Sequence, residues 1–211
     1  MTRQALIAGN WKMNGSRQQA TTLAGGIAKG ADAADAEVLL CPPFPYLGLV
    51  GEQLAGTDVA LGAQNLSQHD EGAFTGETSA SMLVDCGCRY VIVGHSERRQ
   101  FYAEDSSLVA EKARVAAAGG LRPILCVGET LEERESGSTE QTIEAQLAPV
   151  FDHDAATYGD FVIAYEPVWA IGTGKTASPE QAQEVHAFIR TALSGWNGDA
   201  AHAQGFCTVA V

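Results

Sequence analysis

The stretch FVIAYEPVWAIGTGKTAS, Phe161 to Ser178, decides the fold because it contains a complete strand-to-helix unit. Its apolar start, Phe161 to Ala164, lies between charged residues and predicts a short buried strand. Glu166 follows where that strand should end, and Pro167 to Lys175 forms a loop with a rigid start and a glycine-rich finish. Ser178-Pro179-Glu180-Gln181 then carries the capping-box pattern of a helix N-terminus. A carboxylate followed by a hinged loop predicts a catalytic acid or base under a movable lid.

Five further apolar runs precede this unit and predict a repeated strand–helix architecture. They recur at intervals of roughly 20 to 40 residues, and helix-like segments follow most of them. The runs are Ala5–Ala8, Val38–Cys41, Val59–Leu61, Tyr90–Val93 and Ile124–Val127, and the clearest helical segments are Ser16–Lys29, Leu108–Ala118, a capped segment from Ser138, and Pro179–Leu193. The pattern predicts one α/β domain with a parallel sheet.

Composition narrows the class of protein. The 211-residue chain has a formal net charge of -13 and a pI near 4.7, which argues against binding to nucleic acid or to an anionic membrane. No apolar run approaches the length of a membrane span, and the N-terminus is too polar for a secretory signal, so we expect a cytoplasmic protein.

The five cysteines show no paired CxxC spacing. Cys86-Gly87-Cys88 is the one arrangement that resembles half of a metal or redox site, but reduced, buried thiols are the favoured interpretation. We therefore expect no metal and no redox role.

The residues that follow the apolar runs are more informative than the runs themselves. The polar or turn-forming residues that come directly after a predicted strand are Asn10 and Lys12, Pro42-Pro43, Gln64-Asn65, His95-Ser96-Glu97, Gly128-Glu129 and Glu166. In a parallel βα array the carboxyl ends of the strands meet on one face, where such folds place their sites. A surface lysine, a core histidine or a strand-end glutamate alone has an ordinary structural explanation. Together, Lys12, His95 and Glu166 predict a shared site.

These three side chains suit proton transfer between adjacent carbons. A carboxylate shielded from water is a stronger base. His95 precedes a predicted helix capped by Ser96, and the positive end of that helix favours a neutral imidazole that can donate to an enolate oxygen. Lys12 supplies fixed positive charge, and the Gly172 and Gly174 amides of the lid are candidates for binding phosphate. The predicted chemistry is an aldose–ketose isomerisation.

Several motifs of the chain resemble those of the triosephosphate isomerase family over residues 5 to about 193. The motifs are Ala8–Asn14 (AGNWKMN), Gly62–Asn65 (GAQN), Gly72–Glu77 (GAFTGE), Val93–Arg99 (VGHSERR) and Ala164–Lys175 (AYEPVWAIGTGK). The resemblance implies a (β/α)8 TIM barrel and the interconversion of dihydroxyacetone phosphate and D-glyceraldehyde 3-phosphate, a step of glycolysis and gluconeogenesis, in a cytoplasmic homodimer without a metal or organic cofactor.

The resemblance also implies a role for individual residues. Glu166 would shuttle the proton, His95 would polarise the carbonyl oxygens, and Lys12 and Asn10 would bind substrate. Ser96, Glu97 and Cys126 would support these groups, and Thr75 would enter the neighbouring subunit beside its Asn10 and Lys12. The implied lid consists of Pro167, Val168, Trp169, Ala170, Ile171, Gly172, Thr173, Gly174 and Lys175, with the Gly172 amide on the phosphate.

The end of the chain departs from this resemblance. We expect residues 1–193 to form about six of the eight βα units and residues 194–211 to form an aberrant tail without the seventh and eighth strands. Read two bases along from the last base of the Gln204 codon, codons for the tail can encode Arg-Ile-Leu-Tyr-Gly-Gly-Ser, which resembles the family's seventh strand and phosphate turn. This predicts a frameshift between Ser194 and Gln204. A chain ending in this way should have unpaired strand edges, low solubility and little activity.

Three other functions compete with the isomerase. Gly174-Lys175-Thr176 matches the end of a nucleotide-binding P-loop, but the glycine required five residues before Gly174 is Trp169. Another barrel enzyme acting on a phosphosugar would share the fold but not the combined motifs. A non-catalytic, truncated fragment of an isomerase remains the principal alternative.

Overall fold

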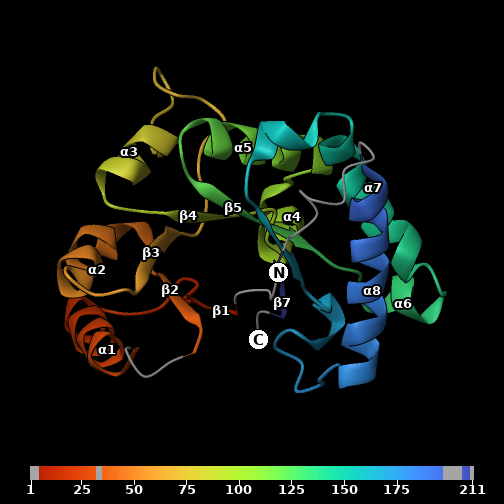
Figure 1. Ribbon diagram of the computed structural model, residues 1–211, viewed down its shortest axis with the longest axis horizontal. Coiled ribbons are helices and arrows are strands. Elements are labelled where there is room, and N and C mark those ends of the chain that lie inside the picture. Colours follow the sequence, from red (N-terminus) through yellow and green to blue (C-terminus); the bar gives the residue numbers. More distant parts are fainter. Residues whose placement is uncertain (1–4, 32–34, 197–205, 210–211) are drawn as a thin grey trace.

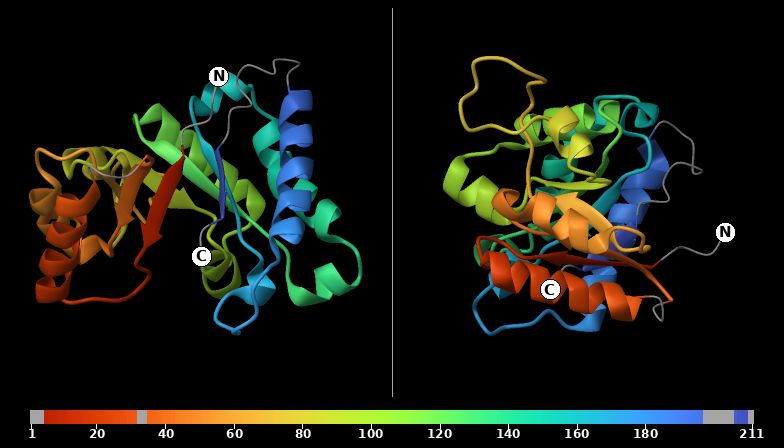
Figure 2. Two further views of the ribbon diagram at one scale, coloured as in Figure 1. Left: turned by 60° about the horizontal axis from the view of Figure 1, so that its bottom comes forward. Right: turned by 90° about the vertical axis from the view of Figure 1, so that its left-hand side faces the viewer.

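The computed structural model describes residues 5–31, 35–196 and 206–209. Seven parallel strands form one sheet in which each strand pairs with the next along the chain. They are β1 (Leu6–Asn10), β2 (Glu37–Cys41), β3 (Ala60–Ala63), β4 (Tyr90–Val93), β5 (Arg122–Val127), β6 (Val162–Tyr165) and β7 (Phe206–Val209). The sheet curls until β1 and β7 lie near each other (Figure 2). The predicted parallel α/β architecture is confirmed.

Helices cover the outer side of the curled sheet (Figure 1). They are α1 (Arg17–Gly30), α2 (Leu47–Leu54), α3 (Ala80–Asp85), α4 (Ser96–Tyr102), α5 (Ser106–Ala118), α6 (Leu131–Glu135), α7 (Thr139–Phe151) and α8 (Pro179–Gly195), with short 3-10 turns η2 (Phe44–Tyr46), η3 (Ala155–Tyr158) and η4 (Val168–Ala170). Helices that follow successive strands pack side by side, as α1 does on α2 and α7 on α8. Six strands are thus each followed by helix, which agrees with the expected number of βα units.

Alternating side chains divide the core into two parts. Successive strand residues point to opposite faces of a sheet. Outward residues such as Leu40, Val91 and Ile163 join the large cluster between the sheet and the helices. Inward residues such as Leu39 and Ile92 form a smaller cluster inside the curl. Both faces of β3, β4 and β6 are therefore buried, which explains why their sequences are almost continuously apolar, whereas Ile7 of β1 is 59% exposed.

Of the two capping boxes that the sequence predicts, the one at Ser178 is confirmed and the one at Ser138 is not. The Ser16 hydroxyl caps α1 by accepting from the Gln19 amide, and Ser178 and Gln181 form the predicted capping box of α8. The capping box predicted at Ser138 is wrong, because its side chain makes no cap hydrogen bond. Its hydroxyl instead lies 3.0 Å from that of Ser136, so the preceding turn uses the group that the helix would need.

The tail contains a strand that the sequence analysis did not expect. Phe206–Val209 pairs in parallel with β6, with Phe206 opposite Val162 and Val209 opposite Tyr165. The expectations that the tail lacks a seventh strand and that β6 has an unpaired edge are therefore wrong; the ends of the sheet are β1 and β7. Phe, Cys, Thr and Val suit a strand, and β6 offers them a template. Tail residues 197–205 and 210–211 lie outside the described residues. The frameshift stays a prediction that the coding DNA beyond Leu193 tests.

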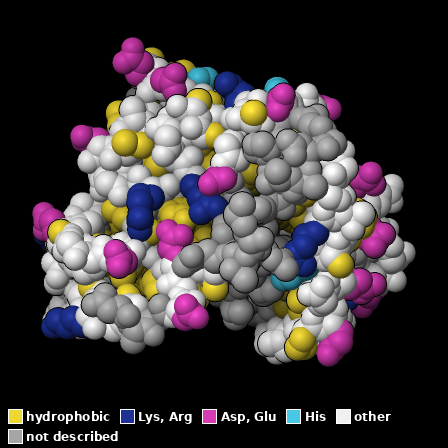
Figure 3. All heavy atoms as spheres, in the orientation of Figure 1, with side chains coloured by type: hydrophobic (Ala, Val, Ile, Leu, Met, Phe, Trp, Pro, Cys, Tyr) yellow, Lys and Arg dark blue, Asp and Glu magenta, His cyan; other side chains and the backbone are white. Residues whose placement is uncertain are grey.

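Asp and Glu side chains occur around the rim of the face in Figure 3, and the described part of that face carries no large basic patch. Across the described ranges, every helix is too short or too polar to cross a bilayer.

Candidate active site

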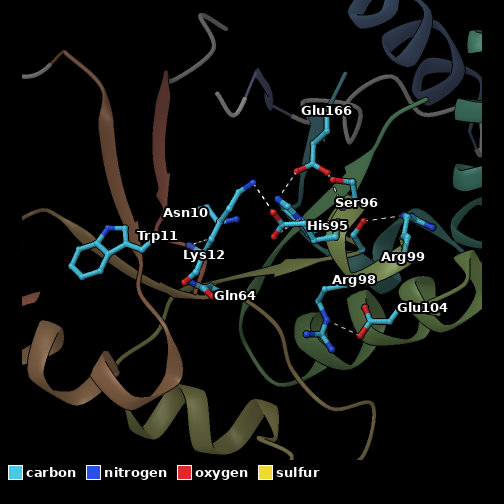
Figure 4. A network of polar contacts seen from close by, with 12 residues as sticks. Asn10, Trp11, Lys12, Gln64, His95, Ser96, Arg98, Arg99, Glu104 and Glu166 are labelled. Carbon is cyan, nitrogen blue, oxygen red and sulfur yellow. Dashed lines mark hydrogen bonds and ion pairs between the residues drawn. The ribbon is translucent and has the colours of Figure 1, made fainter. Parts of the chain in front are cut away.

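Glu166 is buried at the carboxyl end of β6, with an exposed fraction of 3%. One carboxylate oxygen, Oε2, accepts from the backbone N–H of Ser96 at 2.9 Å. The other, Oε1, lies 2.9 Å from Nε2 of His95 (Figure 4). The Glu166 backbone N–H donates to the carbonyl of Val127 at 2.8 Å, which continues the pairing of β5 with β6. The carboxylate is thus held between two groups from the end of β4.

His95 lies between β4 and α4 and has a defined hydrogen-bonding state. Its Nδ1 accepts from the backbone N–H of Glu97 at 3.2 Å. A nitrogen that accepts in this way carries no proton, so the neutral ring has its proton on Nε2, facing Glu166. The prediction that Ser96 caps α4 is wrong: the ring of His95 is the cap, and the amide of Ser96 binds Glu166 instead.

Lys12 has the left-handed backbone conformation that is unusual for a residue other than glycine, with φ of 50°. Its N–H donates to Oδ1 of Asn10 at 3.0 Å, and its carbonyl accepts from Nε2 of Gln64 at 2.9 Å. The ammonium lies 2.8 Å from Oε1 of Glu97. Backbone strain of this kind persists where the surroundings fix it, often at functional sites. Through Glu97, Lys12 joins His95 and Glu166 in one set of contacts (Figure 4).

Cys126 and Arg99 support the arrangement of Lys12, His95 and Glu166. Cys126 is buried, and burial followed by the charge of Glu166 raises the pKa of its thiol well above the usual range. Arg99 donates to the carbonyls of Gly94 at 2.9 Å and Cys126 at 3.2 Å, and to Oγ of Ser106 at 3.0 Å. It therefore ties the end of β4 to the end of β5. Sequence reasoning missed Arg99, although it lies within the quoted motif Val93–Arg99.

The loop predicted to be a lid, residues 167–175, is held near its N-terminal end by hydrogen bonds and a ring contact. Trp169 Nε1 donates at 2.9 Å to Oε1 of Glu129, a fully buried carboxylate that also accepts from Tyr165 and Arg134. The Arg134 guanidinium lies over the Trp169 ring, 5.1 Å from its centre. Burial and then the charge of Glu129 raise the pKa of Tyr165. Sequence reasoning noted Glu129 as a strand-end residue but missed its role as lid anchor.

The tip of the lid is exposed. Gly172 and Gly174 have φ of 69° and 76°, conformations that favour glycine, and both face solvent. The lid is therefore held at one end and open at its tip.

Thr75 lies away from the other predicted site residues. It belongs to an exposed loop that projects from the molecule between β3 and α3 (Figure 2). The loop turns at Gly72 and Gly76, with φ of 126° and 93°, and is stiffened by His69 stacked on Phe74 at 3.8 Å. Within a single chain, Thr75 does not join the site.

The described residues offer no obvious metal site. Over these ranges, no group of three or more His, Cys, Asp and Glu side chains is arranged to hold a metal ion. The four cysteines whose side chains are described, Cys41, Cys86, Cys88 and Cys126, are free thiols.

A curled parallel sheet with ionisable groups gathered at the carboxyl ends of its strands defines a barrel-type enzyme. The comparison with known proteins is more specific: the chain belongs to the triosephosphate isomerase family, whose model matches residues 5–205. This match extends past Leu193, where the motifs had placed the end of the resemblance.

Curated relatives support the same family. A triosephosphate isomerase of Thiobacillus denitrificans is 58% identical over 204 residues, which cover 96% of this chain and 81% of the relative. Triosephosphate isomerases of Stenotrophomonas maltophilia strain K279a and Rhodopirellula baltica are 55% and 56% identical, over 89% and 92% of this chain and 75% and 77% of their own lengths. The predicted family is confirmed.

Proposed function

We propose that the chain interconverts dihydroxyacetone phosphate and D-glyceraldehyde 3-phosphate by proton transfer through an enediolate. The observation that best supports this proposal is the distance of 2.9 Å between the Glu166 carboxylate and the protonated Nε2 of a neutral His95. This pairs a base with a hydrogen-bond donor that keeps its proton in the resting state. Membership of the triosephosphate isomerase family supports the same reaction.

Each group has a distinct role in this proposal. Glu166 releases the Ser96 amide, takes a proton from one substrate carbon and returns it to the neighbouring carbon. His95 Nε2–H donates to the oxygen on which charge develops, and its neutrality avoids a costly charge separation. Lys12 supplies positive charge to the phosphate and the enediolate. Asn10 holds the Lys12 backbone, and the Gly172 amide binds the phosphate when the lid closes.

We further propose that two chains associate beside this site. Met13, Phe101 and Tyr102 are 94%, 68% and 65% exposed. Phe101 and Tyr102 are neighbours at the end of α4, and adjacent exposed apolar side chains favour a protein interface. Met13 adjoins Lys12, and Phe101 and Tyr102 end the helix that His95 begins. A homodimer would also bring the projecting Thr75 loop of one chain to the Asn10 and Lys12 of its partner.

A cytoplasmic address and a place in glycolysis and gluconeogenesis follow from this proposal. The substrate is an anion whereas the chain carries a net charge of -13, so recognition must depend on Lys12 and local backbone amides rather than on the overall field.

Sedimentation of the purified chain tests the proposed dimer. A single species of monomer mass at micromolar concentration would contradict it.

The function is tested by turnover of D-glyceraldehyde 3-phosphate by the purified 211-residue chain. We expect Glu166→Gln to lower kcat by about 100-fold to 10,000-fold, because a positioned general base contributes on that order. Glu184→Gln, which changes an exposed carboxylate on α8, is the matched control and should leave kcat unchanged. A folded wild-type chain without turnover would support the alternative of a non-catalytic fragment.

A further inference from the structure

Gln146 on α7 binds both polar groups of one backbone residue at the end of β5. Its Oε1 accepts from the N–H of Gly128 at 2.8 Å, and its Nε2 donates to the carbonyl of Gly128 at 2.9 Å. The side chain thereby imitates a neighbouring strand and satisfies a backbone residue that lies just beyond the sheet. Both the backbone donor and the backbone acceptor of Gly128 are therefore engaged by one side chain.

Gly128 in turn lies directly against Glu166. A Cβ atom at position 128 would come within 1.8 Å of the carbonyl oxygen of Glu166 and 2.8 Å of its carbonyl carbon. The two backbones therefore meet at van der Waals contact, with no room for adjustment. A shift of Gly128 toward Glu166 must therefore displace the backbone that carries the proposed base.

The next residue along the chain anchors the lid. Glu129 accepts the indole N–H of Trp169 at 2.9 Å, as described above. Gln146 thus holds the one residue between β5 and the lid anchor. Gln146 and Glu166 also line a common cavity of about 340 Å³, together with Val168 of the lid.

We propose that Gln146 is a positioning residue, which holds Gly128 so that Glu166 and the Glu129–Trp169 contact keep their places. The proposal rests on the proposed function for its kinetic consequences, but its structural part stands independently. Gln146 acts through Gly128, to which both polar atoms of its side-chain amide bind.

The test compares Gln146→Met, which keeps the side-chain length but removes both polar atoms, with Gln141→Met on the exposed side of the same helix. For Gln146→Met we expect amide hydrogen exchange in residues 127–131 and 165–170 to become faster by at least about fivefold, since each lost hydrogen bond is worth about 1 kcal/mol. We expect kcat to fall about tenfold and KM to stay within about twofold. Gln141→Met should match the wild type in all three measurements. Gln146→Glu retains an acceptor for the Gly128 N–H but loses the donor, and it should give intermediate exchange.

Unchanged exchange in both segments of Gln146→Met would overturn the proposal. So would a loss of kcat accompanied by an equal acceleration of exchange throughout the chain, since that pattern marks a general loss of stability. If Gln146→Met fails to fold, Gln146→Glu decides, because wild-type exchange in that variant also overturns the proposal. A wild-type chain without turnover contradicts the proposed function alone, and the exchange measurement still decides the role of Gln146.

Discussion

Replacing Gly128 with alanine tests how tightly the end of β5 supports the proposed base. The new Cβ would lie 1.8 Å from the carbonyl oxygen of Glu166, whereas real Cβ contacts are essentially never shorter than 3.0 Å. The two backbones must therefore separate by the difference, about 1.2 Å. A displacement of about 1 Å at a catalytic group costs about 100-fold in rate, or about 2.7 kcal/mol of transition-state stabilisation. We expect Gly128→Ala to lower kcat by about this factor.

The assay is steady-state turnover of D-glyceraldehyde 3-phosphate, with thermal unfolding measured on the same samples. Overpacking should also lower the free energy of unfolding by about 1–3 kcal/mol. Gly48→Ala is the matched control, because Gly48 is an exposed residue of α2 and a Cβ there would meet nothing within 4 Å. It should leave kcat unchanged and slightly increase stability. If Gly128→Ala retains wild-type kcat and an unchanged unfolding midpoint, the close support of Glu166 by β5 is refuted.

Three further predictions concern the lid, the ammonium group and stability. Trp169→Phe removes the indole N–H that donates to Glu129. Because a hydrogen bond to a charged group is worth about 1.5–3 kcal/mol, amide hydrogen exchange in the lid should become about tenfold faster or more. Unchanged exchange in the lid would contradict the role of Glu129 as its anchor. Lys12→Met should lower kcat/KM by about 100-fold, because the ammonium group is proposed to bind the anionic substrate. The unfolding midpoint should hardly change, because the ion pair of Lys12 with Glu97 is more than one-third exposed. A near-normal kcat/KM would contradict a role of Lys12 in substrate binding. Burial, and secondly the charge of Arg190, lowers the pKa of His186 in the folded chain. The unfolded chain therefore binds a proton at His186 more readily, so the free energy of unfolding falls as pH drops below about 6.5. The unfolding midpoint of His186→Phe should therefore drop less than that of the wild type between about pH 7.5 and about pH 5.5, and parallel drops would count against the assignment.

The strands and the main site residues could be predicted because both depend on local sequence. A strand buried on both faces is a short apolar run, and β1 to β6 each contain one. Parallel strands place the residues that follow them on one face, so Lys12, His95 and Glu166 could be predicted to converge before any contact was known. Their proposed roles remain to be tested by the variants above.

The details that could not be predicted depend on contacts between distant residues. His95 caps α4 and Ser96 is its first residue, whose N–H is bound by Glu166 across 70 residues of sequence. Glu129 becomes the lid anchor only through Trp169, 40 residues away. The strand β7 likewise depends on its pairing with β6, because the sequence of the tail alone gives only a weak β-propensity signal.

The most direct test of the account is to follow dihydroxyacetone phosphate by proton NMR in D2O with the purified chain. A carboxylate that removes a proton from carbon holds it within reach of solvent exchange, so part of the transferred hydrogen is replaced by deuterium before it is returned. We therefore expect part of the D-glyceraldehyde 3-phosphate to carry deuterium at the carbon that receives the proton, and Glu166→Gln to slow product formation and deuterium incorporation together by about 100-fold to 10,000-fold. Product formation and deuterium incorporation by Glu166→Gln at the wild-type rates would contradict Glu166 as the base that carries the proton through an enediolate.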